Sequence, residues 1–165
     1  MIKNGKKLLK TWLPLFLVVI LALFLRLLWL DRVPIAIVDD ELDYILDAKS
    51  IFLSGEDLSG GWSPFSLKTP PHQVPKAELP ALVIAPLIGP LKFSLFSARL
   101  PFIIWGVILL ISLFLIARRF FGDKVALIVA AVTAINPWSL YFSRTSFDIP
   151  LALVFYLIAF YLLIS

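Results

Sequence analysis

The 165-residue sequence contains no cysteine and only one histidine, His72. The lack of cysteine excludes disulfides, cysteine-ligated zinc and thiol catalysis together. A single histidine is too few for a histidine-rich metal site. The chain also lacks a glycine-rich phosphate-binding loop, so a nucleotide bound by such a loop is not expected.

Hydrophobic residues make up 61% of the chain and charged residues only 16%. The apolar residues gather in runs of about twenty, which indicates an integral membrane protein. The formal net charge of +4 comes without a basic patch interleaved with aromatics, so nucleic acid is not an expected partner. We predict an all-α, polytopic membrane protein with four transmembrane helices, over residues 11–30, 98–117, 125–141 and 149–165.

Two groups of cations set the expected orientation. Four lysines precede the first span, and Arg118 and Arg119 lie between the second and third spans. Because cations of short loops stay on the cytoplasmic side, we expect a multi-pass protein of the cell membrane with a cytoplasmic N-terminus. An even number of crossings must then separate the two groups. Residues 79–96, apolar but broken by prolines, are therefore expected to be interfacial or re-entrant, within an outer loop over residues 31–97.

The outer loop carries nine of the eleven acidic residues. Its first part predicts an amphipathic helix over about residues 40–54, with Asp39 as the N-cap and Gly55 as the C-terminal stop. Carboxylates are unfavourable beside a membrane, so this concentration of acids suggests a site. On the polar side of the helix we expect three aspartates: Asp40, Asp43 and Asp47.

The expected topology brings acids and cations from distant positions to one membrane face. A carboxylate there can accept a proton from an acceptor hydroxyl, and a cation beside the lipid can hold a phosphate leaving group. This combination suits transfer from a lipid-linked phosphate donor. No cofactor is clearly indicated; the clustered acids leave a divalent metal open, although no spacing identifies its ligands. The residues concerned are Asp39, Asp40, Glu41, Lys76, Arg99, Arg144 and Asp148.

A series of short motifs covers nearly the whole chain. They are Asp40-Glu41 with Tyr44 and Ala48, Ser54-Gly55-Glu56-Asp57, Lys76-Ala77-Glu78-Leu79, Ala98-Arg99-Leu100-Pro101, Phe121-Gly122, Asn136-Pro137-Trp138 and Ser143-Arg144. In order and spacing they resemble the N-terminal portion of GT-C-type membrane glycosyltransferases, in the branch of protein O-mannosyltransferases and lipid A aminoarabinose transferases. The resemblance implies hexosyl or pentosyl transfer, with inversion, from a polyprenyl-phosphate donor to a protein, lipid or glycan acceptor. We expect residues 1–165 to be the N-terminal part of one such transmembrane domain, truncated and inactive alone.

The resemblance also implies roles for individual residues. Asp40 matches the first acid of the family's Asp-Glu motif, the catalytic base, and Glu41 is the second acid of that motif. Lys76 matches a lysine that contacts the lipid phosphate, although the motif here lacks its first proline. Asp148 matches a second acid that opens the fourth span. Arg144 and Arg26 are two further candidates for binding the phosphate, on their positive charge and their expected depth in the membrane alone.

Each candidate is also open to a plainer interpretation. Acids in the first turn of a helix are favoured by the helix dipole. Lys76 could be an ordinary interfacial lysine and Arg99 a headgroup anchor. Arg144 and Asp148, four positions apart, could form a helical ion pair. The alternative function is a non-catalytic polytopic scaffold or a transporter subunit, but a transporter would place its ionisable groups at mid-membrane.

Overall fold

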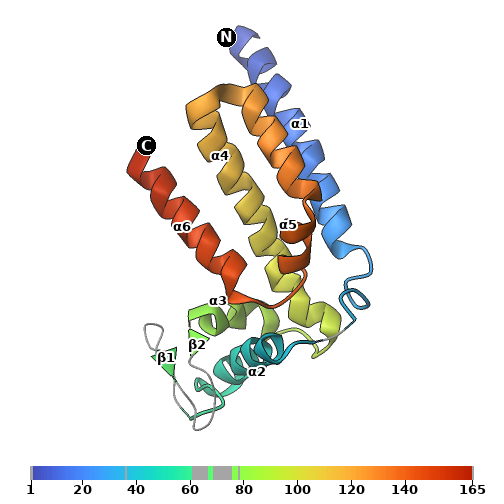
Figure 1. Ribbon diagram of the computed structural model, residues 1–165, viewed down its shortest axis with the longest axis vertical. Helices are drawn as coiled ribbons and strands as arrows, with labels where there is room; N and C mark the ends of the chain where they lie inside the picture. The colour runs from blue at the N-terminus through green and yellow to red at the C-terminus, as the bar shows by residue number, and fades with distance from the viewer. Residues whose placement is uncertain (1, 36, 61–66, 69–75, 78, 165) are drawn as a thin grey trace.

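The computed structural model is almost entirely helical (Figure 1). It describes residues 2–35, 37–60, 67–68, 76–77 and 79–164, with the backbone alone for residues 2–10, 67–68 and 76. The all-α prediction holds apart from one ribbon, in which Leu67 pairs antiparallel with Ala77. The elements are α1 (Ile2–Leu27), α2 (Asp39–Ser54), β1 (Leu67–Lys68), β2 (Lys76–Ala77), α3 (Leu79–Ile88), α4 (Leu95–Ile135), α5 (Pro137–Phe142) and α6 (Asp148–Ile164).

The longest element, α4, is a helical hairpin. Gly122 has φ 80° and ψ 178°, a backbone conformation open only to glycine, and it separates an arm over residues 95–121 from an arm over residues 123–135. The hairpin turn lies at the same end of the bundle as the start of α1 (Figure 1). The first arm contains the helix predicted over residues 98–117, and the second arm covers only the first part of the helix predicted over residues 125–141. Of the short loop expected between them, only Gly122 departs from helical geometry.

The turn of this hairpin is fastened to α1 by Asp123. The carboxylate of Asp123 accepts a hydrogen bond from the Thr11 hydroxyl at 2.7 Å and one from Arg118 Nε, also at 2.7 Å. The guanidinium of Arg118 lies 5.3 Å from the centre of the Trp12 ring. The N-terminal part of α1 and the basic loop therefore share one end of the bundle, as the distribution of cations predicted.

Small residues allow α1 and the two arms of α4 to pack closely. Ala126, Ala130 and Ala134, spaced four apart on the second arm, are fully buried in a cluster with Ala22 of α1 and Phe114 of the first arm. Such spacing brings helix backbones close together in membrane proteins. The outward face of α1 is strongly apolar and exposed, through Leu13, Phe16, Leu17, Ile20, Leu21 and Phe24.

The prediction of an unbroken third span over residues 125–141 is wrong. The second arm of α4 ends at Ile135, Asn136 is extended with φ −61° and ψ 127°, and α5 begins at Pro137. Proline has no N–H to continue the helix and disfavours helical geometry in the residue before it. The Asn136 side chain then caps α5 by accepting from the Ser139 N–H at 3.1 Å.

Only part of the described chain forms a helix that is long enough to span a membrane. Among its helices, α4 alone is long and apolar enough by length and composition to cross a membrane. The apolar stretches Thr11–Leu27 and Asp148–Ile164 are shorter, as is α3. The ten residues of α3 extend about 15 Å, half the thickness of the hydrocarbon layer, in keeping with a segment that does not cross.

A layer formed by α2 and α3 covers the end of the bundle opposite the Gly122 turn (Figure 1). Its core contains Ile45 and Ala48 of α2, Ile84 of α3 and Phe102 of α4. The layer is also tied together by Lys49, whose ammonium donates to the carbonyls of Gly89 and Leu91 just beyond α3. The start of α4 is thus packed against α2, which places the first turn of α2 beside the bundle.

The predicted amphipathic helix matches α2 closely, but two details of the prediction are wrong. Asp39 is not the N-cap: it is the first helical residue, and Val38 precedes it without a side-chain cap. Asp47 is buried and does not lie on an exposed polar side, and its carboxylate accepts a hydrogen bond from the Leu58 N–H in the turn after the helix. Gly55 ends the helix as predicted, with φ 80°.

Gly106 on α4 provides a test of this packing. A Cβ at this position would lie 2.4 Å from Ser143 Cβ and 3.1 Å from Arg26 Nε. We expect Gly106→Ala to destabilise the protein by about 1–3 kcal/mol through overpacking, measured as a lower unfolding temperature in detergent. Adding Ser143→Gly removes the nearest atom and should recover much of the loss. Equal stability of Gly106→Ala and the wild type would contradict this packing.

Candidate active site

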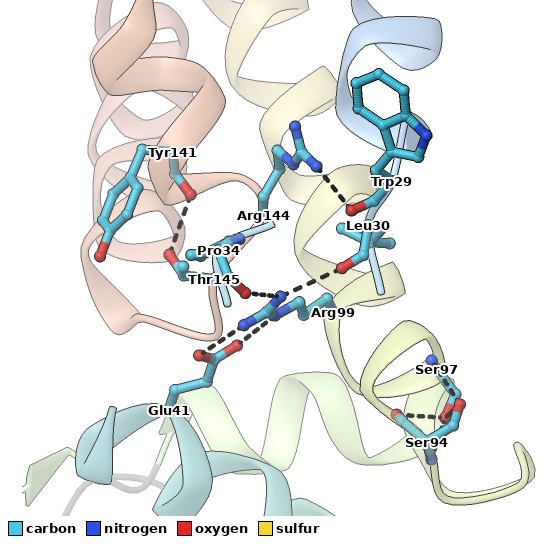
Figure 2. Close-up of polar contacts among 10 residues, drawn as sticks. All are labelled: Trp29, Leu30, Pro34, Glu41, Ser94, Ser97, Arg99, Tyr141, Arg144 and Thr145. Atoms are coloured by element: carbon cyan, nitrogen blue, oxygen red, sulfur yellow. Dashed lines mark hydrogen bonds and ion pairs between the residues drawn. The ribbon is translucent and has the colours of Figure 1, made fainter. Parts of the chain in front are cut away.

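Four distant segments meet where the α2 layer contacts the bundle. Figure 2 shows Glu41 on α2, Arg99 on α4, the chain after α1 from Trp29 to Pro34, and the turn before α6 that carries Arg144. The first turn of α2 is strongly acidic, with Asp39, Asp40 and Glu41, and α6 opens on another acid, Asp148. The first turns of α2 and α6, together with Arg99 and Arg144, therefore lie at the same end of the molecule (Figures 1 and 2).

Arg99 and Glu41 form a fully buried ion pair at the centre of this junction. Arg99 Nε donates to Glu41 Oε1 at 2.9 Å, and neither side chain has any exposed surface. A second contact from Arg99 Nη2 to Glu41 Oε2 is 3.4 Å long. Arg99 Nη1 also donates to the carbonyls of Pro34 at 2.8 Å and Leu30 at 3.2 Å. Arg99 is therefore not a headgroup anchor: it joins α2, α4 and the chain after α1.

Arg144 closes the other side of the junction by capping α1. Its Nη2 atom donates to the carbonyls of Leu28 at 2.6 Å and Trp29 at 3.2 Å, beyond the last turn of α1. Burial, and secondarily the charge of Arg99, hold the pKa of Arg144 below its ordinary value. Because Arg144 lies in the turn before α6, it does not share a helix with Asp148, and the simple helical ion pair is wrong.

Tyr44 lies on α2 one turn after Asp40, and its side chain is 5% exposed. Burial raises the pKa of its hydroxyl, and the carboxylates of Asp148, Asp40 and Asp43 raise it further. The Tyr44 hydroxyl therefore stays protonated at neutral pH. Asp40 is itself exposed and Asp148 half-buried, so solvent reaches this acidic group.

Arg26 lies away from this acidic group, inside the bundle. Its side chain is fully buried and donates to the carbonyls of Ala22 and Ala134, each at 3.2 Å, and to the Ser139 hydroxyl at 2.9 Å. These contacts join α1 to the end of α4 and to α5. Backbone carbonyls and a hydroxyl group inside the protein thus bind the Arg26 guanidinium. It is not presented at a surface where a phosphate could bind.

Lys76 lies on β2, but its side chain is outside the described part of the chain. A metal centre finds no support among the described residues, where no group of three His, Cys, Asp or Glu side chains could hold an ion. One feature of the site has no counterpart in the sequence-based roles, the Arg99–Glu41 pair. The signal available was an arginine at the start of an apolar stretch, but spacing alone does not identify its partner.

The arrangement can support proton transfer beside a cationic junction. Asp40 presents an exposed carboxylate on the first turn of α2, where a hydroxyl-bearing molecule could reach it. Asp148 provides a second carboxylate in the first turn of α6. Behind them, Arg144 and Arg99 provide positive charge, of which Glu41 offsets one unit. This distribution of charge suits a reaction in which a carboxylate accepts a proton and an anion is released beside the arginines.

Comparison with protein families matches residues 80–165 to the family described as dolichyl-phosphate-mannose-protein mannosyltransferase. The match covers slightly more than half of the chain, including α4, α5, α6 and the residues Arg99, Arg144 and Asp148. No curated protein and no solved structure matched the chain. The family match and the apolar helices together indicate a membrane glycosyltransferase that uses a polyprenyl-phosphate sugar donor. The chain belongs to the dolichyl-phosphate-mannose-protein mannosyltransferase family.

Proposed function

We propose that this protein transfers a sugar from a polyprenyl-phosphate-linked donor to an acceptor hydroxyl at the outer face of the cell membrane, with inversion. The observation that carries the proposal is the buried Arg99–Glu41 pair, which holds the first turn of α2, with its exposed Asp40, against α4. The family description supports mannose as the sugar and a protein as the acceptor.

In the proposed reaction Asp40 is the base. The acceptor oxygen attacks the anomeric carbon on the side opposite the phosphate, and its proton passes to the Asp40 carboxylate. The bond between the anomeric carbon and the phosphate oxygen breaks as the new glycosidic bond forms. A single displacement of this kind inverts the anomeric configuration. Asp40 suits this role because it is exposed, whereas Glu41 is buried against Arg99 and serves to position the helix.

The departing polyprenyl phosphate requires positive charge close to the membrane. We assign this role to Lys76, on its position in the motif, together with the field of Arg144, whose guanidinium lies near that of Arg99. Arg26 receives a structural role instead, because its guanidinium is held by Ala22, Ala134 and Ser139. Asp148 is assigned as a second acid that contacts the acceptor or the sugar.

The proposed membrane topology has four crossings, by α1, the two arms of α4, and α6. These segments run alternately up and down in Figure 1, while α3 lies across one end. With the basic Gly122 turn in the cytoplasm, the α2 layer and Asp148 fall on the outer side. The same motif order supports the protein O-mannosyltransferase or aminoarabinose transferase branch.

The test is a transfer assay with the full-length protein in vesicles. Polyprenyl-phosphate mannose is supplied with a serine- and threonine-containing peptide, or with lipid or glycan acceptors in parallel. We expect release of polyprenyl phosphate matched by glycosylated acceptor, with the opposite anomeric configuration by NMR. Retained configuration would contradict the single displacement. No transfer to any acceptor by the folded protein would favour the non-catalytic scaffold or transporter subunit.

A further inference from the structure

A second pair of arginines lies at the other end of the bundle, close to the Gly122 turn (Figure 1). Arg118 and Arg119 are in the last turn of the first arm of α4, and with Leu115 and Tyr161 of α6 they line a hollow of about 290 Å³. The proposed sugar transfer gives this hollow no role. Small-molecule pockets begin at about 300 Å³, so its size suits one small charged group.

Contacts on both sides hold the walls of the hollow. Arg118 Nε donates to the Asp123 carboxylate at 2.7 Å, which fixes this arginine beside the turn. The ring of Phe120 stacks on Phe160 of α6, with 6.3 Å between the ring centres. Tyr161 follows Phe160 in the chain and is therefore kept beside the first arm of α4.

The donors around the hollow match the oxygens of a phosphate group. Asp123 offsets one of the two positive charges, and Arg119 is exposed, so an anion can reach its guanidinium. A guanidinium binds phosphate oxygens through two parallel N–H donors. Tyr161, which lines the same hollow, has a hydroxyl that can donate to a further oxygen.

We propose that this hollow binds the headgroup of an anionic phospholipid at the cytoplasmic surface of the membrane. A lipid is the expected source of the phosphate, because the hollow lies between two helices that the topology proposed above places in the membrane. Leu115, one turn before Arg119, adds an apolar wall along which an acyl chain can lie. Basic pockets between transmembrane helices on the cytoplasmic side are typical sites for anionic headgroups.

The test is native mass spectrometry of the full-length protein in detergent, titrated with dioleoylphosphatidylglycerol. We expect this lipid to bind at least about tenfold more tightly than dioleoylphosphatidylcholine, which has the same chains and no net charge. Arg119→Gln should weaken its binding about 10- to 100-fold, the effect of losing a charge-assisted hydrogen bond. Tyr161→Phe keeps the ring and should weaken binding about three- to tenfold.

Lys124→Gln is the matched control. It removes an exposed cation that follows the same turn but does not line the hollow. We expect it to weaken phosphatidylglycerol binding less than about fivefold, the effect of one charge near a membrane surface. Arg118 is left unchanged in these variants because it pairs with Asp123.

Four results would overturn the proposal. Phosphatidylglycerol might bind no more tightly than phosphatidylcholine, or Arg119→Gln and Lys124→Gln might lose affinity equally, which would indicate diffuse attraction. Wild-type affinity in both Arg119→Gln and Tyr161→Phe would place the lipid elsewhere. Equal affinity for inorganic phosphate, measured by competition, would identify free phosphate as the ligand. Because the assay uses no sugar donor, its failure is distinguishable from failure of the proposed transfer.

Discussion

Asp40→Asn is expected to lower kcat for sugar transfer by about 100- to 10,000-fold, the range that a general base contributes. Asparagine keeps the size of the side chain but cannot accept the proton of the acceptor hydroxyl. Because Asp40 is exposed and lies in the first turn of α2, the change should leave folding intact. The measurement is single-turnover transfer from polyprenyl-phosphate mannose, with the unfolding temperature recorded on the same preparation.

Asp39→Asn is the matched control for this prediction. It removes the same charge from the neighbouring position, and Asp39 is also exposed in the first turn of α2. Both variants therefore reduce the favourable interaction with the helix dipole similarly. We expect Asp39→Asn to retain kcat within about threefold of wild type, well short of the effect of removing a general base. Full turnover by Asp40→Asn, or an equal loss in both variants, would exclude Asp40 as the base.

The second large effect is expected from the Arg99–Glu41 pair. Removing one partner leaves the other charge buried and uncompensated, which costs about 3–5 kcal/mol. Both side chains are fully buried, so solvent does not screen the loss. We therefore expect Arg99→Met and Glu41→Leu each to lower the unfolding temperature strongly in detergent. Activity should fall with it, because the pair holds α2 and its Asp40 against α4.

The double variant Arg99→Met/Glu41→Leu separates charge from packing. Replacing a whole buried ion pair by apolar residues is often close to neutral, so the double variant should be more stable than either single variant. Arg32→Gln is the exposed control, since Arg32 pairs with Asp31 at 3.8 Å with both side chains largely in solvent. It should not change the unfolding temperature measurably. If the single variants were as stable as Arg32→Gln, the pair would not hold the junction together.

The helical part of the fold could be predicted because apolar runs, Gly55 and Gly122 are local signals. Runs of membrane-compatible length indicate helices wherever they occur. The α2 prediction was accurate to one residue at its start, and Gly55 ended the helix as expected. The break at Asn136 was missed because apolar residues continue on both sides of it. The helix ends there despite the hydrophobic pattern, because Pro137 has no N–H to continue it.

The site could be predicted only in outline. Topology and motif order placed Asp40 and Asp148 at one end, and the structure has the first turns of α2 and α6, which carry them, at that end. The partners of Arg99 and Arg26 could not be predicted, since both contacts depend on tertiary packing between distant helices. A buried arginine needs several acceptors at once. Backbone carbonyls supply several of these acceptors, and no sequence pattern marks them.

Cysteine labelling in intact cells tests the central claim, an outer-face site, most directly. The chain has no native cysteine, so single cysteines give a clean background. Ser59 follows α2 and Lys124 follows the Gly122 turn, and both are exposed. We predict that Ser59→Cys reacts with a membrane-impermeant maleimide, whereas Lys124→Cys reacts only after permeabilisation. Labelling of both from the same side, or the reverse pattern, would contradict a transfer site on the outer face.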